Sequence, residues 1–564
     1  MKIMKKIFYI GAVLMATSLV SCNDLLDKYP LDTFTNSPTY WSNVNNLENQ
    51  CNTFYNNYSG YTGWYYFKNL SDDQVAADGD LNWTYTTVPS SSSNWSAPYT
   101  EIRRANYILE GIKMSSLDEK ETKPFAGIAR MNRAWQYYLL VRMYGDVQWI
   151  DYVMDPADEK NVYGAREDRD VVMDKVLEDL KFAVETIGGG RRDRFSSDMA
   201  RAMLAEVALY EGTYCQYRTA ADNGKAADPA RAKKYLKECV DACAAIMANT
   251  AYELTADYKT NYNSIDLSKN KEMIFFKPYE TNLMCHSLVD YTLNTGGTHG
   301  MTKDAFDSFL FLDGKPLATT TKDKDDAAYK TAEGKYSLDK VLSVRDKRLS
   351  AIIDPVLVMK GSPYSRHGSA EFTSTTGYGI AKYDNWDEMT VDERNNIGKQ
   401  YTDAPIYWLS VIYLDYAEAK AELGELTQGD LDKSVNKLQA RAGLPAMTTS
   451  PAADPANDMK VSNIIWEIRR CRRCELFCDN WFRYWDLVRW HQLDKLDSQK
   501  NPDIYLGANL KNVSNPEVDV NAAGYMKGSN TENLARKYEN KHYFYPIPSG
   551  QLILNENLKQ NPGW

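Results

Sequence analysis

Helix-period hydrophobic stripes constrain the fold of this chain more than any other feature. Between about residues 100 and 250, apolar residues recur at i, i+3, i+4 and i+7 with polar residues opposite, which is the spacing of a helix buried along one side. Such stripes run over residues 131–143, 173–187, 200–207 and 232–247. Gly145 and the run Gly188–Gly190 end the first two, and Ser196 and Ser197 are candidate caps for the third. Short turns between such helices predict helical hairpins.

The rest of the chain is less regular. Residues 255–400 are rich in Gly, Thr, Asp and Tyr, and segments such as 295–300 and 319–321 are typical of loops. Helical stripes return over residues 408–424 and 431–443, the second ended by Gly443, and residues 500–564 are mostly irregular. We therefore predict a mainly α fold, a helical-hairpin scaffold interrupted by long irregular loops. Loops of such length are usually functional or disordered.

The first 22 residues indicate the compartment. Lys2, Lys5 and Lys6 precede an apolar run that ends in Leu19-Val20-Ser21-Cys22. This pattern is typical of a lipoprotein signal peptide over residues 1–21, with Cys22 as the lipidated residue of the mature chain. A cleaved signal followed by a chance cysteine is the alternative. A second run long enough to cross a bilayer is absent from the sequence, so we expect an anchored protein.

The amino-acid composition limits the kinds of molecule that this protein is expected to bind. The 66 Lys and Arg residues and 76 Asp and Glu residues are interspersed, for a net charge of −10, so no basic face for nucleic acid is indicated. The 40 Tyr and 13 Trp residues outnumber the 16 Phe residues. Tyr and Trp combine a flat apolar face with a polar group, which suits wet binding surfaces.

The cysteine and carboxylate patterns do not indicate a metal site or a catalytic site. Cys471, Cys474 and Cys478 fall on one predicted helix face without a fourth ligand for zinc, so we expect them to pack in the core, as do Cys239 and Cys243. No metal, cofactor or catalytic residue is predicted, because hydrolase and phosphate-loop motifs are absent. A glycosidase-like carboxylate pair stays open, but neighbours such as Asp72 and Asp73 are expected to face solvent.

Several segments in order along the chain resemble the SusD/RagB family of nutrient-binding outer-membrane lipoproteins of Bacteroidetes. These segments are residues 22–27, 95–110, 130–150, 413–445, 469–490 and 545–564. Two departures stand out. Gln148 replaces a common proline, and the stretch Cys478–Arg483 is one residue longer than the family's Glu-Gly-His-Arg element, so we expect altered packing there.

The resemblance implies a SusD-like scaffold of tetratricopeptide-like helix pairs, with loops that form a ligand face. It implies a SusC-like TonB-dependent transporter as partner, with the lipoprotein as its lid at the outer leaflet of the outer membrane. We expect two regions, residues 22–250 and 251–564, to pack as one globular unit. The second comprises a loop-rich part (255–400), a helical part (405–495) and a closing segment (540–564).

Aromatic residues in polar loops are the candidate ligand contacts, because sugar C–H faces stack on rings and sugar hydroxyls need amide partners. The candidates are Trp64, Tyr65, Asn82, Trp83 and Tyr85 in one cluster, Tyr291, Asn294 and His299 in loops that carry ligand contacts in SusD-like proteins, and Trp386. We expect these clusters to be neighbours, with the Trp83 ring off the core. The alternative is that the rings pack under loops or against the barrel.

These features favour a cell-surface protein that captures a glycan for a SusC-like transporter and catalyses no reaction. A peptide binder in the same import role is the alternative, and a surface glycoside hydrolase is less favoured. Aromatic and amide loops suit sugars better than peptides, which prefer sheet edges, grooves or charged clamps.

Overall fold

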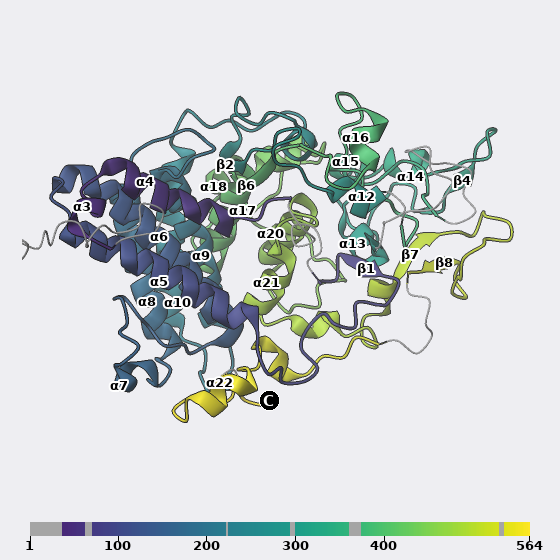
Figure 1. The fold of residues 1–564 in the computed structure, drawn as a ribbon. Helices are drawn as coiled ribbons and strands as arrows, with labels where there is room; N and C mark the ends of the chain where they lie inside the picture. Colours follow the sequence, from purple (N-terminus) through teal and green to yellow (C-terminus); the bar gives the residue numbers. More distant parts are fainter. Residues whose placement is uncertain (1–35, 62–69, 222–223, 294–298, 360–373, 529–534) are drawn as a thin grey trace, which may run out of the picture.

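Long helices form one end of the molecule. The computed structural model describes residues 36–61, 70–221, 224–293, 299–359, 374–528 and 535–564. In Figure 1 the helices of the first 250 residues lie side by side on the left. Their bounds are α3 Pro38–Trp41, α4 Val44–Asn52, η2 Thr53–Asn57, α5 Ser93–Met114, α6 Glu119–Tyr144, α7 Glu159–Val162, α8 Arg169–Thr186, α9 Ser197–Tyr217 and α10 Pro229–Met247.

Local signals explain where these helices begin and end. Helix α6 begins with a capping box of Asp118 and Glu121 and ends at Gly145, whose φ of 73° is readily adopted by glycine. The Ser196 side chain accepts a hydrogen bond from the Met199 amide at the start of α9. The predicted stop and cap are thus confirmed.

The apolar stripes are buried as predicted. Helix α5 packs against α6, α6 against α8, α8 against α9 and α9 against α10, so consecutive helices form a continuous layer. On α10 the buried side chains are Ala232, Tyr235, Leu236, Cys239, Ala242, Cys243 and Ile246. They follow the predicted helical spacing. The tetratricopeptide-like helix pairs expected from the sequence are therefore present.

Short elements and small sheets make up the middle of the chain. They are β1 Gln74–Ala76, α11 Thr260–Asn263, β2 Met273–Lys277, α12 Leu288–Leu293, β3 His299–Met301, α13 Lys303–Ser308, β4 Tyr329–Lys330, β5 Tyr336–Ser337, α14 Asp339–Leu342, α15 Lys347–Ile352 and α16 Val391–Asn395. Antiparallel β1 and β3 pair Ala76 with His299, and β2 pairs with β6 (Ala404–Trp408). The prediction of loop at His299 and Gly300 is wrong, because this pairing draws both residues into a strand.

The remaining elements join the two ends. They are α17 Leu409–Glu422, α18 Gln428–Asp432, α19 Val435–Arg441, α20 Asn463–Glu475, α21 Phe482–Arg489, η3 Leu493–Leu496, η4 Pro502–Tyr505, β7 Leu506–Asn509, β8 Tyr525–Lys527, η5 Asn540–Tyr543 and α22 Ser549–Leu554. Figure 1 shows α20 and α21 between the long helices and the strands β1, β7 and β8. The single helix predicted over 431–443 is two short ones, because the backbone leaves helical geometry at Ser434.

The chain's last residues return to α6. The Tyr545 amide donates to the Met143 carbonyl, and the Asn561 side chain donates to the carbonyls of Tyr144 and Tyr545. Arg166 in turn donates to the Asn561 side-chain oxygen. These bonds satisfy carbonyls that the end of α6 leaves without helical partners.

Buried ion pairs connect α20 and α21 to the rest of the fold. Arg472 contacts Asp415 at 2.6 Å and Asp486 at 2.8 Å, while Arg473 contacts Asp73 at 2.8 Å. Arg483 holds Asp72 through two bonds of 2.6 and 2.7 Å. Asp72 and Asp73 are therefore buried, and the expectation that they face solvent is wrong. Arginine partners compensate for the cost of removing these carboxylates from water.

The cysteines after Cys22 are free, and all but Cys285 are buried. Core packing is confirmed for Cys239 and Cys243 on α10 and for Cys471 and Cys474 on α20. Cys478 lies beyond the end of α20, so the prediction that it shares a helix face with them is wrong. Within the described ranges, no helix has both the length and the apolar character needed to cross a bilayer.

Glu418 provides a stability test of the buried ion pairs. Both its oxygens accept from Arg489, at 2.6 and 2.7 Å, and burial, which alone would raise its pKa, is outweighed by Arg489, so the pKa falls to about 2. We expect Glu418→Gln to lower the free energy of unfolding at pH 7 by about 3 kcal/mol, because Arg489 loses a buried anion. Urea unfolding measures this.

The pH dependence has a defined sign. Because the folded pKa of Glu418 lies below the ordinary value of 4.5, the stabilisation is complete above pH 4.5 and is lost as the pH falls towards 2. The difference between wild type and Glu418→Gln should shrink over that range. Glu425→Gln, at an exposed site with Lys420 at 3.7 Å, is the control and should change stability by no more than about 0.5 kcal/mol. A difference independent of pH would contradict this account.

Candidate functional site

An aromatic cavity of about 720 Å³ lies between the long helices and the C-terminal elements. Its volume suits a small oligosaccharide or a ligand of drug size. Aromatic and amide side chains dominate its walls. The described lining residues with such side chains are Asn57, Tyr58, Asn82, Trp83, Tyr85, Asn94, Trp135, Tyr407, Asn480, Trp481, Trp485 and Tyr545. We refer to it below as the aromatic cavity.

Separate parts of the chain supply the walls. Trp135, Leu139 and Arg142 recur at i, i+4 and i+7 on α6, so one face of that helix lines the cavity. The segment from Asn82 to Asn94 forms another wall, and residues around the start of α21 a third. The site depends on the tertiary fold, because each wall lies far from the others in sequence.

Several rings at the cavity are partly exposed. The half-buried aromatic residues of the lining are Tyr85, Trp135, Trp481 and Tyr545. The rings of Tyr85 and Tyr545 meet edge to face with centroids 5.0 Å apart, and the Tyr85 hydroxyl lies 3.1 Å from the Ser92 hydroxyl. Each ring is thus held by packing or a hydrogen bond while part of its surface stays accessible. Such faces can stack on the C–H surface of a sugar.

The loop before α21 has an unusual backbone. Cys478, Asn480 and Trp481 have φ values of 61°, 42° and 64°, a left-handed region that residues with side chains seldom adopt. Such conformations persist where surrounding structure enforces them, often at functional sites. Here the loop directs Asn480 and Trp481 to the aromatic cavity. This is also the stretch that the sequence shows to be one residue longer than the family element.

Polar atoms at the aromatic cavity lack partners within the part of the chain that the structure describes. Asn57 Nδ2, Thr84 Oγ1 and Arg142 Nε are buried and make no hydrogen bond there. Buried polar groups without partners are uncommon in native proteins and call for a water or a ligand. Residues with unsatisfied hydrogen-bonding groups therefore stand beside the aromatic faces of the cavity.

The structure brings part of the first predicted cluster to this cavity. Asn82, Trp83 and Tyr85 all line it. The expectation that the Trp83 ring lies off the core is wrong, because Trp83 is 2% exposed and packs edge to face on His542 with centroids 5.2 Å apart. Trp64 and Tyr65 lie outside the described residues, as do Cys22 and Asn294.

Of the other predicted residues, His299 and Trp386 have described side chains, and neither lines the aromatic cavity. His299 is buried on β3, with Nε2 3.4 Å from an Asp80 oxygen. Trp386 is 45% exposed, and the Arg394 guanidinium lies 3.9 Å from its ring centroid. For Tyr291 the structure describes the backbone, within α12. The expectation that His299 and Trp386 neighbour Trp83 at one site is therefore not met.

Residues that the sequence analysis did not select complete the site. The sequence predicts Trp135 as part of a helical stripe and gives no binding role to the other lining residues Arg142, Trp481, Trp485 and Tyr545. A signal existed for Trp481, the lengthened stretch before α21. The pattern contained none for Arg142, because its position depends on packing between distant segments.

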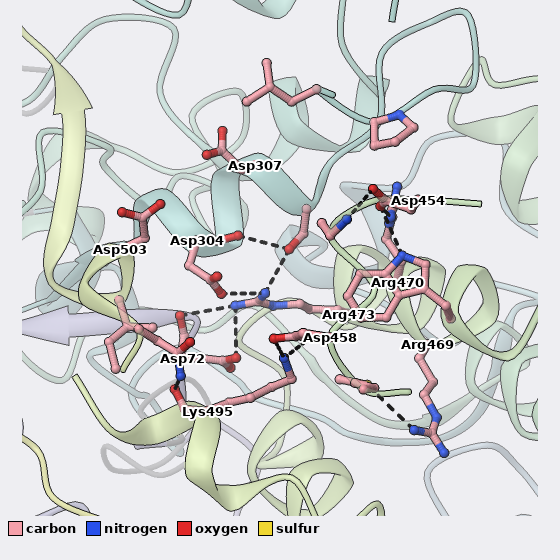
Figure 2. A pocket seen from close by; sticks show the side chains of 18 of the residues that line it. Asp72, Asp304, Asp307, Asp454, Asp458, Arg469, Arg470, Arg473, Lys495 and Asp503 are labelled. Atoms are coloured by element: carbon pink, nitrogen blue, oxygen red, sulfur yellow. Dashed lines mark hydrogen bonds and ion pairs between the residues drawn. The ribbon is translucent and has the colours of Figure 1, made fainter. Parts of the chain in front are cut away.

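A second cavity, of about 450 Å³, is lined by charged residues of both signs. Figure 2 shows Arg473 at its centre, in contact with Asp72 and Asp304, and Arg470 beside Asp454. Lys303 contacts Asp307 and Asp503 at 2.8 and 2.7 Å. These charges largely neutralise one another, so this cavity belongs to the ion-pair system that holds α13, α20 and the segment around Asp72 together.

One group of possible metal ligands occurs among the described residues: Asp170, Glu211 and Cys215. Arg169 contacts Glu211 at 2.5 Å, and Arg218 contacts Asp170 at 2.8 Å. Burial raises the pKa of the Cys215 thiol, which keeps it protonated and a poor ligand. The arginines already serve as the cations of this cluster.

Comparisons with known proteins agree with the fold. A family model described as "SusD family" matches residues 245–564, more than half of the chain. A second model, described as "Starch-binding associating with outer membrane", matches residues 14–209. SusD-like protein P2 of Formosa agariphila is 22% identical over 492 residues, which is 84% of this chain and 80% of the relative.

Solved structures of SusD-like proteins have the same fold as this chain. A SusD-like protein of Bacteroides fragilis superposes with a TM-score of 0.68 at 22% identity, covering 95% of this chain and 100% of that one. A SusD-like carbohydrate binding protein of the same organism gives 0.69 at 20% identity, covering 92% and 100%. At these identities the likeness establishes the fold.

The burial of Trp83 leads to a prediction. We expect Trp83→Ala to lower the free energy of unfolding by about 3–5 kcal/mol, because it leaves a cavity in the core beneath His542. Asn82→Ala, at the exposed neighbouring position, should stay within about 0.5 kcal/mol of wild type. Urea unfolding followed by circular dichroism compares the two. An unchanged midpoint for Trp83→Ala would show that the ring contributes little to packing.

Proposed function

This chain belongs to the SusD family, and from that premise we propose that it is a cell-surface lipoprotein that captures a glycan and delivers it to a SusC-like TonB-dependent transporter. The observation that carries the proposal is the aromatic cavity, where ring faces stand beside buried polar atoms that have no partner among the described residues. Sugars need both kinds of contact. Two of the similar proteins, a family described as starch-binding and a carbohydrate binding protein, support the same ligand class.

Binding without catalysis is part of the proposal. The described lining of the aromatic cavity contains no Asp or Glu. Hydrolysis of a glycosidic bond generally needs two carboxyl groups placed about the scissile bond. In the charged cavity, carboxylates such as Asp72 and Asp454 are engaged by arginines, which leaves them poorly suited to act as general acids. A peptide ligand is the second candidate, but the cavity offers ring faces more than a strand edge or paired terminal clamps.

Both regions of the chain contribute to the proposed site. Trp135 and Tyr85 come from residues 22–250, and Tyr407, Trp481 and Tyr545 from residues 251–564. This shared lining supports the proposal that the two regions act as one globular unit.

The membrane location rests on the N-terminal pattern together with the family. The lipobox at Leu19–Cys22 and the family description "associating with outer membrane" both support an outer-membrane protein. We propose that lipid on Cys22 holds the protein at the outer leaflet, facing the exterior, where it can cover the mouth of its transporter. More than one acyl chain would make this attachment stable.

The glycan-binding proposal can be tested at the cavity walls. We expect Tyr85→Ala and Trp481→Ala each to weaken binding to the cognate glycan by about 30-fold or more, the usual effect of removing a central aromatic contact. Affinity gels with a polysaccharide panel identify the ligand, and calorimetry measures the loss. Reducing ends should not be released.

Trp386→Ala is the matched control for these variants. It removes an aromatic ring of the same type from a surface that does not line the aromatic cavity, so binding should persist. Loss of binding in Trp386→Ala with retention in Tyr85→Ala and Trp481→Ala would move the site to the surface beside α16.

The membrane proposal predicts a change of location. Wild-type protein should fractionate with outer membrane and, after gentle solubilisation, bring down a barrel protein of much greater mass. Their shared surface should exceed about 2,000 Å², as in permanent complexes. Cys22→Ala should leave the outer-membrane fraction. If that variant still labels with lipid and fractionates unchanged, the lipobox interpretation is wrong, and a wild-type sample without the barrel would contradict the transporter role.

A further inference from the structure

Arg142 is the only charged residue in the described lining of the aromatic cavity. It lies on α6 near three rings, with its guanidinium carbon 4.4 Å from the ring centroid of Trp485, 4.8 Å from that of Tyr138 and 5.7 Å from that of Trp135. Rings attract a cation but leave its N–H donors without acceptors. The guanidinium is thus positioned by aromatic contacts and by a hydrogen bond to the Tyr138 side chain.

No carboxylate of the described residues forms an ion pair with Arg142, which sets it apart from its neighbours. Arg130 and Arg133, on the same helix, share Asp179 at 2.5 and 2.8 Å. Arg489, on α21, pairs with Glu418 at 2.6 Å. Arg142 Nε, by contrast, is buried and makes no hydrogen bond with any described residue. A partly buried guanidinium without an anion carries a desolvation cost that a bound anion would offset.

Glu206 on α9 is an acidic group that interacts electrostatically with Arg142. Burial raises the pKa of Glu206 overall, and the nearby charge of Arg142 opposes that rise. The Glu206 carboxylate accepts a hydrogen bond of 2.8 Å from the Tyr407 hydroxyl and does not pair with Arg142. Glu206 therefore moderates the charge of Arg142 without an ion pair, and the Arg142 Nε donor has no partner among the described residues.

Further donors share the aromatic cavity with Arg142. Asn57 Nδ2 and Thr84 Oγ1 are buried and lack partners among the described residues. The residues that carry these groups line, with Arg142, a volume walled by rings. Such a set favours a ligand rich in acceptor oxygens, and a guanidinium binds anionic oxygens most strongly.

We propose that the glycan taken up by the aromatic cavity is acidic, and that Arg142 binds the anionic group on one of its sugar rings. This inference rests on the proposed function, since it names the class of glycan for the same cavity. A uronic-acid carboxylate and a sulfate ester share the necessary chemistry, because both present anionic oxygens to the planar donors of arginine.

The test compares acidic glycans with their neutral counterparts. The probes are oligogalacturonides and their carboxyl-reduced forms, and a sulfated galactan and its desulfated form, each titrated by calorimetry into the full mature chain. Wild type should bind one acidic probe at least about 30-fold more tightly than its neutral form, and that affinity should fall as salt rises. Whichever acidic probe binds distinguishes carboxylate from sulfate. This comparison needs no variant.

Variants then locate the contact. Arg142→Gln should weaken binding of the acidic probe by about 30-fold or more and leave binding of the neutral form nearly unchanged. Arg142→Lys should retain part of the affinity for the acidic probe, because lysine keeps the positive charge but lacks the planar donor group of arginine. Arg103→Gln, at an exposed position on α5, removes the same charge away from the cavity and should bind as wild type. Thermal melting establishes that each variant is folded.

The outcomes separate this inference from the proposed function. Equal affinity of wild type for acidic and neutral forms, or full affinity of folded Arg142→Gln for the acidic probe, overturns the acidic-glycan assignment. If neutral binding is still lost in Tyr85→Ala and Trp481→Ala, the proposed function stands without it. Glycan binding that is insensitive to Tyr85→Ala, Trp481→Ala and Arg142→Gln alike contradicts both.

Discussion

The pairing of Asp72 with Arg483 is the interaction on which the aromatic cavity depends. It joins the segment that leads into β1 to the first turn of α21, and Arg473 adds contacts to Asp72 and Asp73 from α20. Arg536 donates to the carbonyls of Ser71 and Gly79 and so closes the turn between them. One wall of the cavity begins at Asn82, three residues after Gly79, and another at Asn480, three residues before Arg483. The same ion pairs therefore set the separation of the two walls.

Buried arginines have different partners in the helical scaffold and at the aromatic cavity. In the scaffold, Arg133, Arg472 and Arg489 have carboxylate partners at 2.6–2.8 Å, which offset the cost of their burial. Arg142 lies two to three turns beyond Arg133 on α6 and has rings in place of carboxylates. One helix thus combines a stabilising arginine with an arginine that no carboxylate of the described residues pairs. A rigid, fully paired scaffold can hold such an unsatisfied group in place, because the surrounding contacts leave it little freedom to rearrange.

The sequence predicted what depends on nearby residues. The stripes of α10, the Ser196 cap and the Gly145 stop are local signals, and the structure confirms them. Predictions failed where distant partners decide. Asp72 and Asp73 are buried because arginines about 400 residues away neutralise them, and Trp83 is buried beneath His542. At the candidate site, the sequence identified Asn82, Trp83 and Tyr85, but Arg142 resembled any polar residue on a helix, since one of the rings around it, that of Trp485, comes from the distant helix α21.

Net charge and local charge have opposite consequences for the ligand we propose. The chain carries a net charge of −10, which disfavours the approach of a polyanion at long range. At physiological ionic strength, screening reduces that repulsion beyond about 8 Å, whereas a contact inside a cavity is screened far less. Arg142 therefore acts after encounter, where its field is concentrated between the rings of Trp485 and Tyr138. Association would then be slow and discrimination would come from the bound state. A single charged contact adds specificity without the near-irreversible affinity that several charged contacts would produce. This combination suits a protein that must reject most polysaccharides and still release the one that it binds.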